Sequence, residues 1–114
     1  MLDALLFNYA DSLRQLKRFE EAKTLLRKVI PVARRVLGEG HSTTLTMKAI
    51  YADALYMDPG ATLHDLREAV TTLEDVERTA RRVLGGAHPN VRSMEESLQQ
   101  ARAALRRRET SRSA

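Results

Sequence analysis

The sequence has no cysteine and no tryptophan, and it is poor in glycine, proline and aromatic residues. Among 114 residues there are five Gly, three Pro, three Tyr and two Phe. The lack of cysteine excludes disulfides, thiolate metal ligands and a cysteine nucleophile. So few aromatic and turn-forming residues argue against a β-sandwich or a β-barrel. No apolar run approaches the ~20 residues of a membrane span and no secretory signal is visible, so we expect a cytoplasmic protein.

Positive charge exceeds negative charge, but the excess is confined to the C-terminal end. The net formal charge is +4, and residues 106–114 carry +3 of it through four arginines and one glutamate. Domains that bind nucleic acid usually spread Lys and Arg over a whole face. We therefore expect residues 106–114 to form a basic, frayed or disordered tail, and we do not expect nucleic acid as the main partner.

Two stretches of the chain repeat each other. Residues 33–38 read Ala-Arg-Arg-Val-Leu-Gly, and residues 80–85 repeat these six letters 47 positions later. A histidine follows each copy at the same spacing, as His41 and His88. Self-similarity at such a period is typical of stacked structural units.

The repeat continues upstream with a different offset. Tyr-Ala-Asp at 9–11 returns at 51–53, 42 positions later, so the second unit has five extra residues. They fall within residues 57–62, around a Pro-Gly dipeptide that favours a turn. The insertion is thus expected in a loop, where added length costs little.

Apolar residues recur at helical spacing along most of the chain. Gly38 and Gly85 follow two of these stripes as expected C-caps, and Thr62 precedes another as an N-cap. Pro31 lies inside a stripe and predicts a bend, since it lacks an N–H. The sequence therefore predicts an all-α fold of antiparallel helical hairpins with five helices, at about 2–16, 19–37, 43–57, 63–84 and 90–107.

Two motifs resemble a known repeat family. Phe-Glu-Glu-Ala at 19–22, followed by two leucines, resembles the second helix of a tetratricopeptide repeat. Arg-Arg-Val-Leu-Gly-x-x-His, at 34–41 and 81–88, resembles the kinesin light chain subclass of these repeats. The resemblance spans residues 2–105. It implies a short right-handed solenoid of about two and a half repeats, with units at 2–41, 42–88 and 89–105.

The resemblance also implies a function. In arrays of this type the first helices of each repeat line a concave groove that holds a peptide or a helix. Asn8 matches the family's asparagine, whose amide can pair with a peptide backbone, whereas the second unit has Ile50 there. We therefore predict a protein–protein interaction module, an adaptor or scaffold without chemistry of its own. The groove positions carried over are Phe7, Asn8, Asp11, Arg14 and Gln15 in the first unit and Ala49, Ile50, Asp53, Tyr56 and Met57 in the second.

No pattern indicates a catalytic site, a metal site or a cofactor. Nucleophile elbows, phosphate-binding glycine loops, paired carboxylates and His-Glu-x-x-His spacing are all missing. The sequence therefore predicts no enzyme, no metal and no cofactor. We expect His41 and His88 to satisfy backbone groups at the repeat loops, and His64 to lie exposed in a first helical turn.

Two other hypotheses stay open from the sequence. In the first, a basic accessory domain contacts RNA or DNA through the arginine tail, which salt would weaken steeply. In the second, the chain is a structural spacer that self-associates into a homo-oligomer through its exposed repeat ends. A groove that remains open in a monomer would contradict this second hypothesis.

Overall fold

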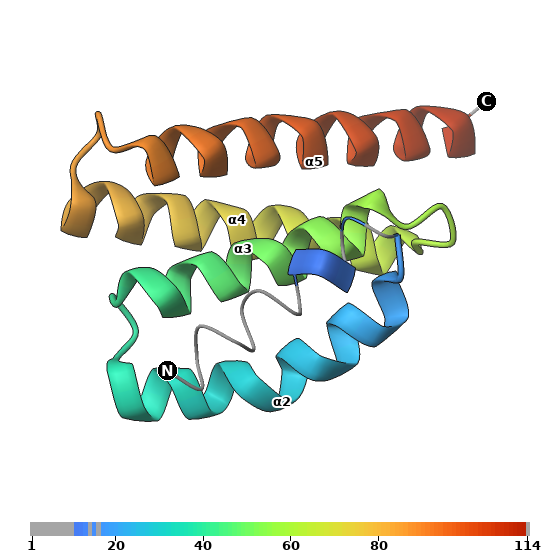
Figure 1. Cartoon of the computed structure of the whole chain (residues 1–114). Coiled ribbons are helices and arrows are strands. Elements are labelled where there is room, and N and C mark those ends of the chain that lie inside the picture. Colours follow the sequence, from blue (N-terminus) through green and yellow to red (C-terminus); the bar gives the residue numbers. More distant parts are fainter. Residues whose placement is uncertain (1–10, 14, 16, 114) are drawn as a thin grey trace.

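The chain folds into consecutive helices joined by short turns (Figure 1). The structure, a computed structural model, describes residues 11–13, 15 and 17–113. No strand occurs in this part, so the predicted all-α fold is confirmed. Residues 11–13 and 15 are helical, and the rest of the predicted first helix lies outside the described residues. The four complete helices are α2 (Phe19–Leu37), α3 (Ser42–Met57), α4 (Leu63–Leu84) and α5 (Pro89–Ser113).

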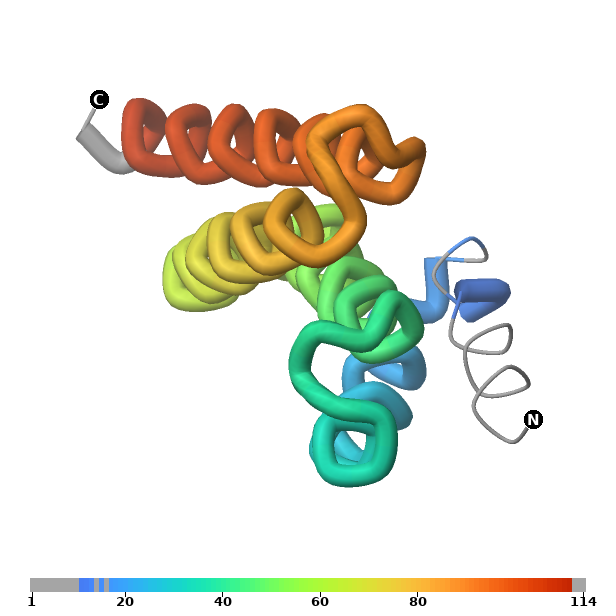
Figure 2. The backbone as a smooth tube through the Cα atoms, turned by 90° about the vertical axis from the view of Figure 1, so that its left-hand side faces the viewer, coloured from blue at the N-terminus to red at the C-terminus, as the bar shows by residue number. Residues whose placement is uncertain are grey.

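Helix α3 occupies the centre of the arrangement. It packs against α2, α4 and α5, and α4 also packs against α5. In the view of Figure 2, α3 is surrounded by other segments. Helices α2 and α4 lie on two of its sides, and residues 11–13 and α5 lie on the other two. Since α2 and α4 are not in contact with each other, part of α3 between them is reachable from solvent.

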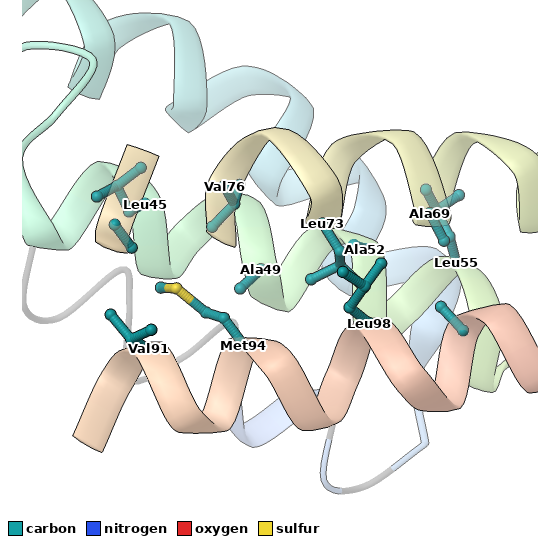
Figure 3. Packing of buried hydrophobic residues seen from close by; sticks show 12 residues of the cluster. Leu45, Ala49, Ala52, Leu55, Ala69, Leu73, Val76, Val91, Met94 and Leu98 are labelled. Carbon is teal, nitrogen blue, oxygen red and sulfur yellow. The ribbon is translucent and has the colours of Figure 1, made fainter. Parts of the chain in front are cut away.

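The main hydrophobic core lies where α3, α4 and α5 meet (Figure 3). Its centre is fully buried, with Leu73 and Val76 of α4 at 0% exposure. Fully buried alanines, such as Ala52 and Ala101, let the helices approach closely. The buried members of this cluster are Leu45, Ala49, Ala52, Leu55, Ala69, Leu73, Val76, Ala80, Val91, Met94, Leu98 and Ala101.

The two repeated glycines end their helices in the same way. Gly38 has φ +100° and Gly85 has φ +91°, in the region that favours glycine. Each donates its N–H to a carbonyl four residues earlier, at 3.1 Å, on Arg34 and Arg81 respectively. The sequence prediction of two C-caps is thus confirmed.

Helix α4 begins with a capping box. The Thr62 hydroxyl accepts a hydrogen bond from the Asp65 N–H at 3.0 Å, and the Asp65 carboxylate accepts one from the Thr62 N–H at 3.0 Å. The predicted N-cap is confirmed. The preceding insertion is a turn, in which the Gly60 N–H donates to Asp58 Oδ1 at 2.8 Å.

Replacing Thr62 by alanine is expected to lower the free energy of unfolding by about 1 kcal/mol, since the Asp65 N–H loses its acceptor. The backbone hydrogen bond from Thr62 comes first among the causes that lower the pKa of Asp65. The stabilisation by the Asp65 carboxylate is therefore present above a pH of about 4 and is lost as the pH falls through the lowered pKa. Urea titrations of Thr62→Ala at pH 7, with Thr62→Ser as the control, would check the role of the hydroxyl, and titrations of wild type and Asp65→Asn at pH 7 and pH 3 would check that of the carboxylate. Equal losses for Thr62→Ala and Thr62→Ser, or a loss for Asp65→Asn that does not shrink at pH 3, would contradict the capping box.

Of two predictions on where helices continue, the one for α2 is confirmed and the one for α5 is wrong. Helix α2 runs through Pro31 without a break and curves along its length (Figure 1), so the prediction that it continues is confirmed. The predicted end of the last helix near residue 107 is wrong, because α5 continues to Ser113. Arginine and glutamate are good helix formers, and Glu109 pairs with Arg67 of α4 at 3.7 Å. The expectation of a frayed tail relied on charge alone and missed both factors.

Candidate functional site

The repeated histidines cap the helices that follow the repeat loops. His41 Nδ1 accepts a hydrogen bond from the Thr43 N–H at 3.1 Å, and His88 Nδ1 accepts one from the Asn90 N–H at 3.1 Å. This confirms the structural role predicted for both imidazoles. His64 lies exposed in the first turn of α4, also as predicted. Among the described residues, no group of three or more His, Asp or Glu is placed to hold a metal ion.

A small pocket lies on the face formed by the first helices of the repeat units. Its volume is about 140 Å³, and it is bounded by residue 11, α3 and α5. We call it the acidic pocket, because its only charged members among the described residues are Asp11 and Asp53. The lining residues are Asp11, Thr46, Ala49, Ile50, Asp53, Asn90, Ser93, Met94 and Ser97.

The repeat brings its two aspartates to this one pocket. Asp11 and Asp53 close the two copies of Tyr-Ala-Asp, on the first helix of each unit. Asp11 Oδ2 accepts a hydrogen bond from Gln15 Nε2 at 2.8 Å, so Gln15 contacts Asp11 although it does not line the pocket. Carboxylates with hydroxyl and amide neighbours attract cations and hydrogen-bond donors.

The other predicted groove residues have different surroundings. Ala49 and Ile50 line the acidic pocket but are only 8% and 4% exposed, so they serve mainly as core. Tyr56 and Met57 border a separate cavity of about 280 Å³ beside the end of α5. There the Tyr56 hydroxyl is 2.9 Å from Gln100 Oε1, its hydrogen-bond acceptor. Phe7, Asn8 and Arg14 lie outside the described residues.

Sequence analysis missed the contribution of α5 to the acidic pocket. Asn90, Ser93 and Ser97 line the pocket from this helix. Their spacing of three and four residues places them on one face of a helix. This polar stripe is a signal in the sequence from which a contribution of residues 90–97 could have been predicted. The groove positions implied by the resemblance all lie in the first two units.

A larger groove, which we call the α2–α4 groove, lies on another side of α3. Its volume is about 600 Å³, and nothing in the sequence pointed to it. It is open because α2 and α4 pack against α3 without packing against each other. The groove is lined by Arg27, Ile30, Pro31, Lys48, Tyr51, Thr71, Thr72, Glu74, Asp75 and Arg78.

The Tyr51 side chain in this groove is held by two charged neighbours. Its hydroxyl donates to Glu68 Oε2 at 3.0 Å and accepts from Arg27 Nε at 3.4 Å. The Arg27 guanidinium also lies 5.8 Å from the centre of the Tyr51 ring. Burial, helped by the Glu68 carboxylate, raises the pKa of Tyr51 above its usual value. The phenol therefore stays neutral and is fixed between the Glu68 carboxylate and the Arg27 guanidinium.

Two of the C-terminal arginines border a cavity of the described part of the chain. Arg107 and Arg108 line the cavity beside Tyr56, together with Asp58 of the α3–α4 turn.

None of the described helices has the length and hydropathy needed to cross a membrane.

Comparisons with known proteins add one finding. No curated protein and no solved structure matches the chain. Residues 8–43 match the family model described as tetratricopeptide repeat, and this match supports a tetratricopeptide repeat in the segment that contains α2.

Proposed function

We propose that the chain is a protein–protein interaction module whose acidic pocket holds a segment of a partner protein. Tetratricopeptide repeats generally mediate protein–protein interactions, and residues 8–43 match such a repeat. The observation that carries the proposal is the convergence of Asp11 and Asp53 on one pocket. No chemistry by the chain itself is needed for this role.

The chemistry of the pocket suggests what the segment presents. Two carboxylates favour a Lys or Arg side chain, since a cation gains from both. Asn90, Ser93 and Ser97 supply further hydrogen-bonding groups from α5. A volume of about 140 Å³ suits one side chain and not a whole helix. We therefore propose an exposed basic residue of a peptide as the anchor.

We further propose that α3 and α4 form a second repeat of the same type, beyond the segment that the family model covers. The matching caps support this, because Gly85 and His88 reproduce the hydrogen bonds of Gly38 and His41. The shared Val-Leu-Gly-x-x-His motif is the basis for assigning both to the kinesin light chain-like subclass.

A displayed library of random peptides, panned against the full chain, would test the proposed pocket. We expect enriched peptides to share a Lys or Arg, and Asp53→Asn to weaken their binding about tenfold, because the cation loses one charge partner. Binding of a Trp-labelled hit can be followed by peptide fluorescence, since the chain has no Trp. Circular dichroism would verify that the variant is folded.

Matched variants make the outcome decisive. Ser97→Lys adds a cation inside the pocket and should also weaken binding, whereas Glu96→Gln, exposed on α5 outside the pocket, should leave it unchanged. Enriched peptides without a basic residue, or hits insensitive to both pocket variants, would refute the proposal. Binding of an RNA pool that vanishes at high salt and needs residues 106–114 would favour the nucleic-acid alternative.

A further inference from the structure

The α2–α4 groove has the size and position of a second binding surface, on a different side of α3 from the acidic pocket. Its volume of about 600 Å³ lies within the range of roughly 300–1,000 Å³ found for ligand sites. Thr71 and Arg78 of α4 both line it. Seven residues of helix measure roughly 10 Å, so the groove is about two helical turns long.

The floor of the groove is apolar and rigid. Ile30 and Pro31 of α2 line it together with Tyr51 of α3, and Ile30 and Tyr51 pack against the same buried cluster. The Tyr51 hydroxyl is held by Arg27 on one side and by Glu68 on the other, so the ring has little freedom to fill the groove itself. Apolar side chains of a partner would thus be buried against a preformed surface.

Pro31 keeps this surface open. The equivalent residue of α4, 47 positions later, is Arg78. A proline ring in place of a long charged side chain leaves the floor of the groove apolar and unfilled at this point. Proline inside a helix destabilises it, so the presence of Pro31 where α4 has Arg78 is consistent with a role other than helix stability.

The two walls differ in charge. Arg27 of α2 and Lys48 of α3 lie on one side, whereas Glu74 and Asp75 line the groove from α4. Within the chain, Lys48 also pairs with Glu39 at 3.2 Å and Glu74 with Arg102 at 3.0 Å, so a partner shares these charges with existing ion pairs. Arg78 also lies on the α4 side, where it pairs with Asp75 at 4.0 Å. A partner that complements both walls carries acidic residues on one flank and basic residues on the other.

We infer that the α2–α4 groove binds an amphipathic helix of a partner protein. Its apolar residues, at i, i+3 or i+4 and i+7, lie on the floor of Ile30, Pro31 and Tyr51. An acidic flank faces Arg27 and Lys48, and a basic flank faces Glu74 and Asp75. Two turns of such a helix match the length of the groove.

Probe peptides of about 20 residues, longer than the roughly 12–15 residues at which isolated helices are marginal, test this inference. All carry the same apolar ridge, and their flanks carry Glu on one side and Lys on the other, Glu on both, or Lys on both. We expect the mixed peptide to bind the full chain about tenfold more tightly than either of the others. Weaker or equal binding of the mixed peptide would overturn the charge assignment.

Variants at Pro31 locate the binding. Pro31→Arg introduces the residue of the equivalent α4 position and should weaken binding of the mixed peptide at least about tenfold, by filling the groove. Pro31→Ala should retain binding, and both should be at least as stable as the wild type because an internal proline is removed. Unchanged binding by Pro31→Arg would refute the site. Loss of binding in Asp53→Asn would place the peptide in the acidic pocket instead, so the two proposals fail separately.

Discussion

Leu73→Ala is expected to lower the free energy of unfolding by about 2–5 kcal/mol. Leu73 is 0% exposed and lies in the middle of the cluster between α3, α4 and α5 (Figure 3). Its neighbours are held by three helices at once, so they cannot easily move into the space left behind. The cost therefore includes both the lost burial of the side chain and the cavity that remains.

Chemical denaturation followed by circular dichroism would measure this loss. A domain of ordinary stability has only about 5–15 kcal/mol in total, so the variant should show a clearly lower midpoint. Val83→Ala is the control, because Val83 is on the same helix but is 50% exposed. Its loss should stay below about 1 kcal/mol. Equal losses for the two variants would show that the core does not lie at the meeting point of these helices.

Local signals made most of the helices predictable. The bounds 19–37 and 63–84 agree with α2 and α4, because each stripe is closed by a repeated glycine. Those glycines act through backbone conformation and a single hydrogen bond, which neighbours in the sequence determine. The histidine caps are equally local, since each imidazole bonds an N–H only two residues away.

The site depended on packing that no local signal encodes. Asp53 and Tyr56 were both predicted to line one groove, and they are only one helical turn apart on α3. The two residues share a face of α3, but this face borders different segments along its length. Asp53 lines the acidic pocket, whereas Tyr56 meets Gln100 of α5. The α2–α4 groove escaped prediction for a similar reason, because it exists only through the separation of two helices on α3.

Lys23 shows the same limit, and it is the most unusual residue of the described core. Lysine is rarely buried in proteins, yet the Lys23 side chain is only 5% exposed. Its Nζ is 2.8 Å from Glu20 Oε1 and 3.5 Å from Asp58 Oδ2, in the turn after α3. Burial by itself lowers the pKa of Lys23, but the hydrogen bond to Glu20 and the nearby carboxylates outweigh it and raise the pKa.

Lys23→Glu is therefore expected to lower the free energy of unfolding by about 3–5 kcal/mol. The change replaces a paired buried cation with an anion next to two carboxylates. Lys23→Met is the matched control, because it keeps the apolar stem of the side chain and adds no charge. Glu20 is 77% exposed and can be hydrated, so the methionine variant should lose less. A glutamate variant as stable as the methionine variant would show that Nζ does not lie between the two carboxylates.

The pH dependence of the difference between wild type and Lys23→Met isolates the ammonium group. A raised pKa means that the folded state holds this proton more tightly than the unfolded state. The stabilisation is then complete below the unfolded pKa of about 10.4 and disappears as the pH rises through the higher folded value. Denaturation of both proteins between pH 8 and pH 12 should show the wild-type advantage shrinking only at the alkaline end. An advantage that stays constant across this range would mean that the charge of the Lys23 ammonium group is not its source.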